Sequence, residues 1–227
     1  MRPLMAREIK MINLFCPLNG IDQEIGYSLF RIFNWPLVAG GYVNEKHVRV
    51  SRGNVRSSVL DIGCIVSGLA ICGHNVKVAS VLIRSEDVAE VDSTIRALTE
   101  HRFPLHNSFG LMYACVGRGA HVYGRQNVES SIFHKYFPNT PLLGFFGNGE
   151  VGCKFPLVDP RSVGDTELQS LGGFPKKLTA SSDKGQSDTK LKNQLAEMRQ
   201  KHETYKMKHP PKLLHAYTTV MCLISLP

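Results

Sequence analysis

The chain has 227 residues, of which 43% are hydrophobic and 20% are charged, and its formal net charge is +8. This composition excludes an intrinsically disordered chain and is typical of one globular domain, or of a domain with an appendage. No run approaches the roughly 20 consecutive apolar residues that a membrane-spanning helix needs, so we expect no membrane partner. Much of the positive charge lies in one late polar segment, and charge alone therefore does not indicate a nucleic-acid partner.

The first elements of the chain predict a parallel pair of strands. Residues 11–16 and residues 36–39 form two short apolar runs typical of strands. Residues 20–33 between them predict a helix with one apolar face, and Pro36 ends it. A strand–helix–strand order of this kind favours a parallel crossover. Because the chain begins almost directly on a strand, we expect it to start inside a larger domain.

The next segments predict a loop, a hairpin and a helix. Residues 44–57 are basic, but no aromatic residue interleaves the charges to stack on bases, so we expect no nucleic-acid partner here. Residues 59–71 and 76–83 are apolar runs joined by a short turn with Gly73 and His74, a pattern that favours a β-hairpin. Ser85 is then the expected N-cap of an amphipathic helix that packs on the sheet.

The central stretch, residues 109–153, contains two apolar runs that both end in glycine-rich corners. Residues 109–116 lead into Gly117-Arg118-Gly119, and residues 141–146 lead into a second corner over residues 147–152. A helix is predicted between them over residues 128–137, with Asn127 as its cap. Apolar runs that stop at glycine are typical of buried strands that open into tight loops. Two such corners after neighbouring strands predict a binding site.

The two corners supply the candidate binding residues. Arg118 is the candidate anion clamp, because a guanidinium pairs bidentately with a carboxylate. The alternative is a structural ion pair between Arg118 and Glu150, which lies in the second corner. The ligand-binding or substrate-binding hypothesis covers six residues in all: Gly117, Arg118, Gly119, Asn148, Gly149 and Glu150.

The six cysteines predict neither a metal site nor a cofactor. None of them forms a C-x-x-C pair, and most lie inside apolar runs, as buried reduced thiols do. Cys115 is a possible reactive thiol because it lies near Arg118, although a buried structural thiol is the alternative. A nucleophile also needs a base, and no spacing singles out one histidine from the four candidates, which are His106, His121, His134 and His215. We therefore predict no catalysis.

The composition changes after the second corner. Residues 154–212 are basic and of low complexity, which predicts a partly disordered or helical insert, and residues 213–226 read as one last strand. The expected organisation is thus a domain over residues 1–153, an insert over 154–212 and a final strand over 213–227. The predicted fold class is α/β or α+β, with a mixed β-sheet flanked by helices.

Three segments resemble the C-terminal FIST domain of the F-box only protein twenty-two family. They read ACVGRG at residues 114–119, GFFGNGEVGC at residues 144–153 and HAYTTVMCLISL at residues 215–226. The similarity covers about residues 11–153 and the last strand. It includes neither an F-box nor the N-terminal half of a FIST region, and residues 154–212 replace a short connection of the family.

The resemblance implies a binding module and no enzyme activity. In this family the F-box recruits Skp–cullin ubiquitin ligase subunits, while the FIST region engages protein substrates for ubiquitination and proteasomal degradation in the nucleus and cytoplasm. Carried over, the loops around Arg118 and Asn148–Glu150 would form the recognition surface. FIST domains also occur in sensory proteins, which leaves an amino-acid-like small-ligand sensor as the alternative function.

Overall fold

The computed structural model describes residues 8–16, 23–43, 67–156 and 211–227. The chain divides into two compact units, residues 1–156 with 212–227, and residues 157–211. The elements described below belong to the first unit. The predictions of an insert with disordered and helical parts therefore lie almost wholly outside the described residues.

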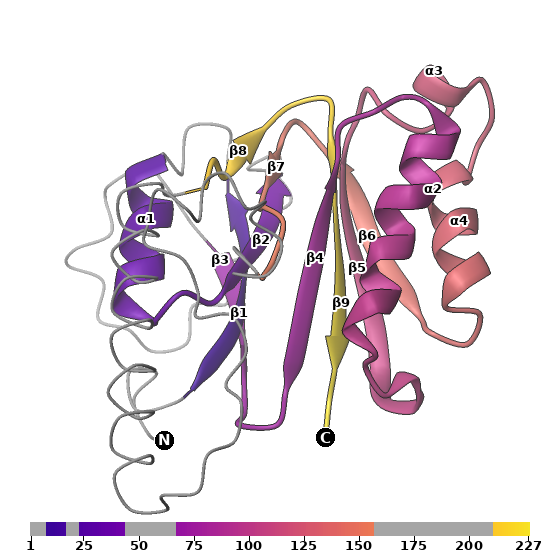
Figure 1. The fold of residues 1–227 in the computed structure, drawn as a ribbon. Helices are drawn as coiled ribbons and strands as arrows, with labels where there is room; N and C mark the ends of the chain where they lie inside the picture. The colour runs from indigo at the N-terminus through magenta and orange to yellow at the C-terminus, as the bar shows by residue number, and fades with distance from the viewer. Residues whose placement is uncertain (1–7, 17–22, 44–66, 157–210) are drawn as a thin grey trace, which may run out of the picture. The chain divides into compact units, whose positions relative to one another are not determined.

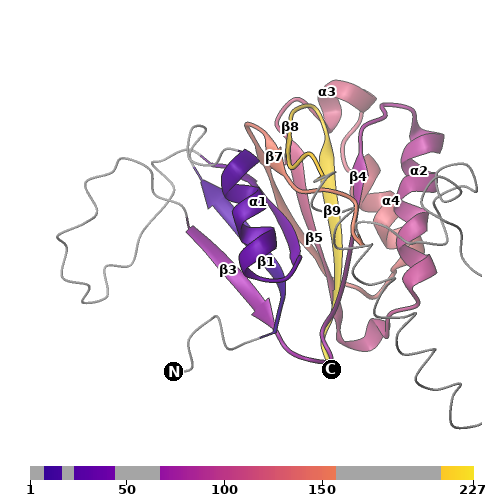
Figure 2. The same cartoon turned by 60° about the vertical axis from the view of Figure 1, so that its left-hand side comes forward.

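The first sheet has five strands in the order β3-β1-β2-β7-β8. Strands β1 and β2 are parallel, from the pair Met11 and Leu37 to the pair Cys16 and Tyr42, and helix α1 connects them. The predicted strand–helix–strand unit is thus confirmed. Helix α1 lies across the outer face of this sheet (Figures 1 and 2). The elements are β1 (Ile9–Cys16), α1 (Gln23–Ile32), β2 (Leu37–Tyr42), β3 (Ser67–Cys72), β7 (Glu150–Val151) and β8 (Leu214–His215).

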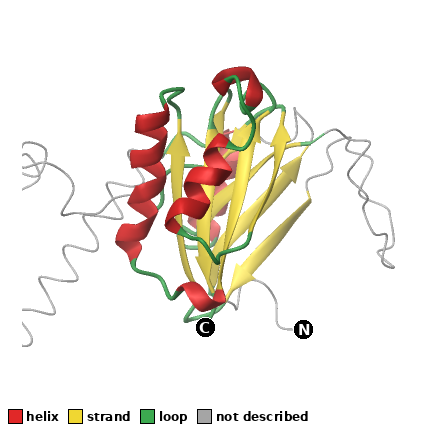
Figure 3. Ribbon diagram, turned by 90° about the vertical axis from the view of Figure 1, so that its right-hand side faces the viewer, coloured by secondary structure: helices red, strands yellow, loops and turns green. Residues whose placement is uncertain are grey.

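The second sheet has four strands in the order β4-β9-β5-β6. Strands β5 and β6 are parallel neighbours, and the connection between them contains α4 and the short α3, which the sequence did not predict. Helices α2 and α4 cover the outer face of this sheet (Figure 3). The elements are β4 (Lys77–Ile83), α2 (Val88–Arg96), β5 (Ser108–Cys115), α3 (Ala120–Tyr123), α4 (Val128–Tyr136), β6 (Leu142–Gly147) and β9 (Thr219–Ser225).

The predicted hairpin between the third and fourth strands is wrong. Strand β3 pairs with β1 in the first sheet, whereas β4 pairs with β9 in the second. The turn after Cys72 therefore carries the chain from one sheet to the other. The physical reason is that β9 offers β4 an antiparallel ladder over all seven of its residues, from Lys77 opposite Ser225 to Ile83 opposite Thr219.

The predicted last strand is also divided between the sheets. Residues 214–215 form β8 in the first sheet, and residues 219–225 form β9 in the second. Tyr217 interrupts the strand conformation between them with a φ of 60°, in the left-handed region that side chains larger than Asn seldom adopt. The α+β class with mixed strands and flanking helices is confirmed, with two sheets in place of one.

The N-cap of helix α2 lies two residues later than predicted. Its N-cap is Asp87, whose carboxylate accepts hydrogen bonds from the backbone N–H groups of Ala89 and Glu90 at 2.9 and 3.0 Å. The Ser85 hydroxyl accepts from the Asp87 N–H at 3.0 Å instead. A carboxylate at this position also interacts favourably with the helix dipole. The helix continues into the 3-10 helix Ala97–His101.

The core has two layers, and β9 belongs to both. Its residues Val220, Cys222 and Ile224 pack between the two sheets, while Met221 and Leu223 pack between the second sheet and its helices. All seven residues of β9 are buried. The two sheets are also joined by a buried hydrogen bond, in which the Tyr113 hydroxyl donates to Asn13 Oδ1 at 2.7 Å. Burial raises the pKa of Tyr113, so this hydroxyl keeps its proton.

Candidate functional site

The two glycine corners meet at one end of the second sheet. Cys115 at the end of β5 lies opposite Gly147 at the end of β6, and the Val116 N–H donates to the Gly147 carbonyl at 2.8 Å. The parallel pairing produces this meeting, because the carboxyl ends of parallel strands lie at the same edge of a sheet. The predicted proximity of the two corners is therefore correct.

The second corner carries the chain from the second sheet into the first. Backbone hydrogen bonds hold it to the end of β2: Tyr42 donates to the Gly149 carbonyl at 3.0 Å, and Asn148 donates to the Tyr42 carbonyl at 3.3 Å. A Cβ atom at Gly149 would lie 2.6 Å from the Tyr42 ring, and its φ is 144°. Glycine is therefore required there. The Asn148 side chain is exposed.

Arg118 forms a buried ion pair, but its partner is not the predicted one. Its Nε donates to Glu129 Oε1 at 2.8 Å, its Nη2 lies 2.7 Å from the same oxygen, and the two side chains are 1% and 6% exposed. Glu129 lies in the first turn of α4. The predicted pair with Glu150 is therefore wrong, because α4 follows the first corner closely enough to bring its own carboxylate to Arg118.

The remaining Arg118 donors bind the backbone of two loops. Nη1 donates to the Tyr217 carbonyl at 3.1 Å and Nη2 to the Ser85 carbonyl at 2.9 Å, while Nη2 also contacts the Tyr123 hydroxyl. Each nitrogen of the guanidinium thus donates to a group of this chain. Arg118 lies inside a structural network, where an external carboxylate does not reach it. Its role as a ligand clamp, as the sequence predicted, has no geometric support.

Glu129 connects this network to the second sheet and to α3. Its Oε1 accepts from the Tyr123 hydroxyl at 2.8 Å, and its Oε2 accepts from the Thr219 hydroxyl at 2.7 Å. Burial and the neighbouring carboxylate raise the pKa of Tyr123. One buried ion pair therefore joins the first corner, α3, α4 and the start of β9. Hydrogen-bond partners satisfy both the guanidinium and the carboxylate, which a buried ion pair requires for stability.

Glu150 forms a second, smaller buried group beside the first. Its Oε2 accepts from the Thr218 hydroxyl at 2.6 Å and from the Thr218 N–H at 3.3 Å. Its Oε1 has no hydrogen-bond partner of normal geometry among the described residues, although the Cys115 thiol lies near enough to lower the pKa of the carboxyl somewhat. Burial is the larger effect and raises the pKa of Glu150 above its usual value of 4.5.

We expect Glu150→Gln to change how stability depends on pH. The folded state holds the Glu150 proton to higher pH than the unfolded state does, so the wild type loses stability as pH rises from 4.5 through the raised pKa. Glutamine carries no titrating proton, and the stability of the variant relative to the wild type should therefore rise over this range, by up to about 1.4 kcal/mol per pH unit.

Urea unfolding of both proteins between pH 4 and 8 measures this difference, with exposed Glu100→Gln as the control for removing a surface carboxylate. A pH-independent difference in stability between wild type and Glu150→Gln would contradict the raised pKa of Glu150.

Three exposed apolar side chains surround the first corner. Val116, Phe146 and Tyr217 are 55%, 52% and 71% exposed. A Cβ atom at Gly117 would lie 3.3 Å from the Tyr217 ring, and one at Gly119 would lie 3.3 Å from the Phe146 ring. The two rings thus stand directly over the two glycines. We call these three side chains the corner surface. Sequence reasoning placed Tyr217 within a strand, and only the fold reveals its position here.

Cys115 lies at the base of the same corner and is 6% exposed. Hydrogen bonds hold two of the four candidate histidines elsewhere: His134 Nδ1 lies 2.9 Å from the Ser130 carbonyl, and His215 Nε2 lies 2.9 Å from the Gly152 carbonyl. In the part of the chain that the structure describes, no hydrogen bond joins Cys115 to a histidine. The geometry does not assemble a thiol–imidazole pair.

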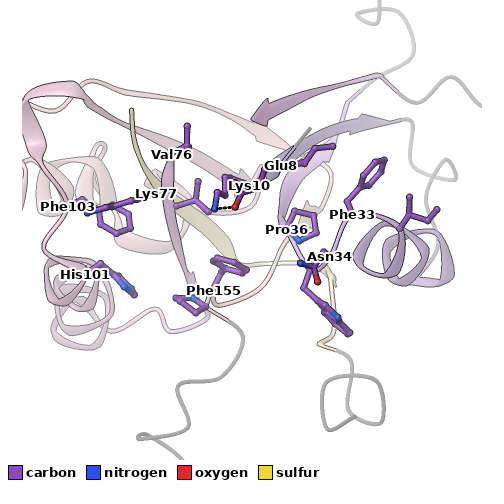
Figure 4. A pocket seen from close by; sticks show the side chains of 15 residues that line it. Glu8, Lys10, Phe33, Asn34, Pro36, Val76, Lys77, His101, Phe103 and Phe155 are labelled. Atoms are coloured by element: carbon purple, nitrogen blue, oxygen red, sulfur yellow. Dashed lines mark hydrogen bonds and ion pairs between the residues drawn. The ribbon is translucent and has the colours of Figure 1, made fainter. Parts of the chain in front are cut away.

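A separate groove of about 590 Å³ lies at the other end of the second sheet. Lys77 at this end pairs with Ser225, the last residue of β9, whereas Ala114 near the corner pairs with Thr219, the first. Figure 4 shows the groove, with Phe155 between Lys77 on one side and Pro36 on the other. Lys10 at its edge is already paired with Glu8. No pattern in the sequence predicted this groove.

The described ranges support neither a metal site nor a membrane-spanning helix. No group of three His, Cys, Asp or Glu side chains there is placed to hold a metal ion. No helix there is both long and apolar enough to cross a membrane.

Comparison with known proteins finds similarity to one family. Residues 48–153 match the FIST C domain. Human F-box only protein 22 is 42% identical over 122 residues, and the protein of that name from Pongo abelii is 41% identical over 122 residues. An uncharacterized protein of Mycobacterium bovis is 30% identical over 77 residues, which is 33% of this chain and 20% of that protein.

The match to F-box only protein 22 covers 52% of this chain but spans only 29% of the length of the human protein. The FIST C match, residues 48–153, includes both glycine corners, and β9 completes the second sheet from outside that range. Residues 48–153 are therefore similar to a FIST C domain, and about half of the chain is similar to part of F-box only protein 22.

Proposed function

We propose that this chain is a protein-binding module whose corner surface holds a protein substrate. The observation that carries the proposal is the exposure of Val116, Phe146 and Tyr217 at one place, above a buried ion pair. Exposed apolar side chains that cluster in this way mark interaction sites on soluble proteins. The few residues that dominate binding energy at protein interfaces are enriched in aromatic side chains such as tyrosine.

The buried ion pair supports this function by fixing the surface before a partner binds. Arg118 holds the Tyr217 carbonyl, and the Tyr217 ring lies against Gly117. The Phe146 ring lies against Gly119, on the other side of Arg118 in the chain. A surface that is already rigid loses less conformational entropy on binding. Arg118 is thus a positioning residue in this proposal and does not itself contact the substrate.

The similarity to F-box only protein 22 supports a role as the substrate-binding part of a ubiquitin ligase adaptor. Substrates held at the corner surface would then be ubiquitinated and degraded by the proteasome, in the nucleus and cytoplasm. The match spans only 29% of that relative, so it does not by itself support contact with Skp–cullin subunits. That contact is a separate part of the proposal and has its own test. A small-ligand sensor is less well supported, since the clamp that it needs, Arg118, is occupied by Glu129.

Affinity purification from cells with the proteasome blocked tests the proposal. We expect the wild-type chain to retain a set of proteins. Phe146→Ala combined with Tyr217→Asn should weaken the affinity for these proteins by about tenfold or more, because truncation of aromatic anchors typically costs over 1.4 kcal/mol of binding free energy. Asparagine is chosen because it tolerates the left-handed backbone of Tyr217.

The matched control is Leu69→Ala on β3 in the first sheet, where an apolar side chain is 60% exposed. Proteins that bind the wild type and this control, but not the corner variant, are then tested as purified proteins. If the same proteins bind all three chains equally, the corner surface is not the binding site. Co-purified cullin-ligase subunits would support the adaptor role separately.

A further inference from the structure

Strand β6 lies at the edge of the second sheet among the strands that the structure describes. Its inner side pairs with β5: Gly110 donates to the Pro141 carbonyl at 2.7 Å and Val116 to the Gly147 carbonyl at 2.8 Å. Backbone groups alternate in direction along a parallel ladder. Leu142, Gly144 and Phe146 therefore direct their N–H and C=O groups away from β5, toward the open side.

This edge lacks the features that usually prevent strand addition. The sequence of β6, LLGFFG, contains neither a charge nor a proline, whereas exposed edges of soluble proteins are normally protected by charged residues, prolines or bulges. Leu143 and Phe146 are also 68% and 52% exposed. The strand runs in register with β5 from Leu142 to Gly147 without a shift. The open edge of β6 thus has a regular register with β5 and exposed apolar side chains beside its outward backbone groups.

The outward groups are arranged symmetrically about Gly144. A second β6 that runs antiparallel, with its own Gly144 opposite, would place Leu142 opposite Phe146 of the second copy and Leu143 opposite Phe145 of the second copy. Both faces of the new ladder would then hold apolar cross-strand pairs, which stabilise antiparallel strands. Glycine at the centre adds no side chain at the twofold axis.

We propose that two copies of this chain associate through antiparallel pairing of their β6 strands, which joins the two four-stranded sheets into one. The occupant of the edge is a second copy, since the strand complements itself in backbone direction and in side chains. This inference does not depend on the proposed substrate. It concerns the edge from Leu142 to Phe146, and it shares only Phe146 with the corner surface.

Sedimentation velocity of the full chain tests the proposal. We expect a dimer that dissociates on dilution, and we expect Leu143→Lys to weaken it by about tenfold or more, because the two new ammonium groups would lie diagonally across the ladder. Leu143 is not a corner-surface side chain and lies on the opposite face of β6 from Phe146, because side chains alternate along a strand, so this variant leaves the corner surface unchanged. The matched control is Leu69→Lys, on exposed β3, which should dimerise as the wild type does.

Amide hydrogen exchange provides a second readout that depends on the backbone alone. The N–H groups of Leu143 and Phe145 point to β5 and should be protected at every concentration. Those of Gly144 and Phe146 should become protected only at concentrations where the dimer forms. A chain that remains monomeric, a dimer that Leu143→Lys leaves intact, or equal exchange of these amides in both states would overturn the proposal.

Discussion

Replacement of Arg118 by methionine is expected to destabilise the fold by about 3–5 kcal/mol, the cost of breaking a buried ion pair from one side. The variant would leave Glu129 charged and 6% exposed beside an apolar side chain, and it would remove the donors to the carbonyls of Tyr217 and Ser85. Because native domains are stable by only about 5–15 kcal/mol, a loss of this size is a large fraction of the total. Urea unfolding followed by circular dichroism measures it.

Two further variants distinguish the ion pair from a general loss of arginine. Arg125→Met changes an exposed arginine in the loop between α3 and α4 and should alter stability by less than about 0.5 kcal/mol. Arg118→Met combined with Glu129→Gln removes both charges and should recover part of the loss. If the double variant were less stable than Arg118→Met by the full cost that Glu129→Gln has alone, the two side chains would not be coupled.

Replacement of Gly40 by alanine is expected to have the second large effect, about 2–4 kcal/mol of destabilisation. Gly40 lies in β2 with a φ of 153°, and a Cβ atom there would lie 1.9 Å from the Leu14 carbonyl oxygen of β1. The backbone conformation alone costs about 1–3 kcal/mol for a residue with a side chain. The clash adds to this cost, because relieving it requires that the parallel pair β1 and β2 move apart.

The matched control for Gly40 is Gly124→Ala. Gly124 also has a positive φ, 64°, but a Cβ atom there would meet nothing within 4 Å. Its cost should be only the left-handed backbone penalty, about 1–2 kcal/mol. Thermal and urea unfolding of both variants give the comparison. If Gly124→Ala were as destabilising as Gly40→Ala, the contact with Leu14 would not be the cause.

Local patterns in the sequence were sufficient to predict most elements and the meeting of the two corners. Apolar runs that end in glycine marked β5 and β6 as neighbouring strands with corners at their ends. The structure adds that the two strands are parallel and that Cys115 lies opposite Gly147. Periodicity and turn residues therefore carried the prediction as far as neighbouring strands along the chain.

The errors concern contacts between residues distant in the sequence. A short glycine turn after Cys72 has the same local signature whether the strands pair or enter different sheets, and only the ladder with β9 decides between these outcomes. The partner of Arg118 and the exposure of Tyr217 likewise depend on how α4 and the start of β9 pack on the corner. Such tertiary packing overrides local propensity.

The roles of the predicted site residues differ once the fold is known. Arg118 and Glu150 are buried in structural networks, whereas Asn148 is exposed beside the corner surface. The side chains that we propose to contact a partner, Phe146 and Tyr217, were not among the predicted site residues. The binding site at the two corners stays a prediction, and the structure identifies which side chains reach the solvent there.

Hydrogen-exchange mapping of this chain, with and without a bound partner, tests the central claim most directly. A protein retained by the wild type but not by Phe146→Ala combined with Tyr217→Asn is added to the purified chain, and the change in amide exchange is measured along the sequence. We predict protection at Val116–Gly119 and at Phe146–Gly149, with little change around Lys77 and Phe155 in the groove. Protection confined to the groove, with none at the two corners, would contradict the account.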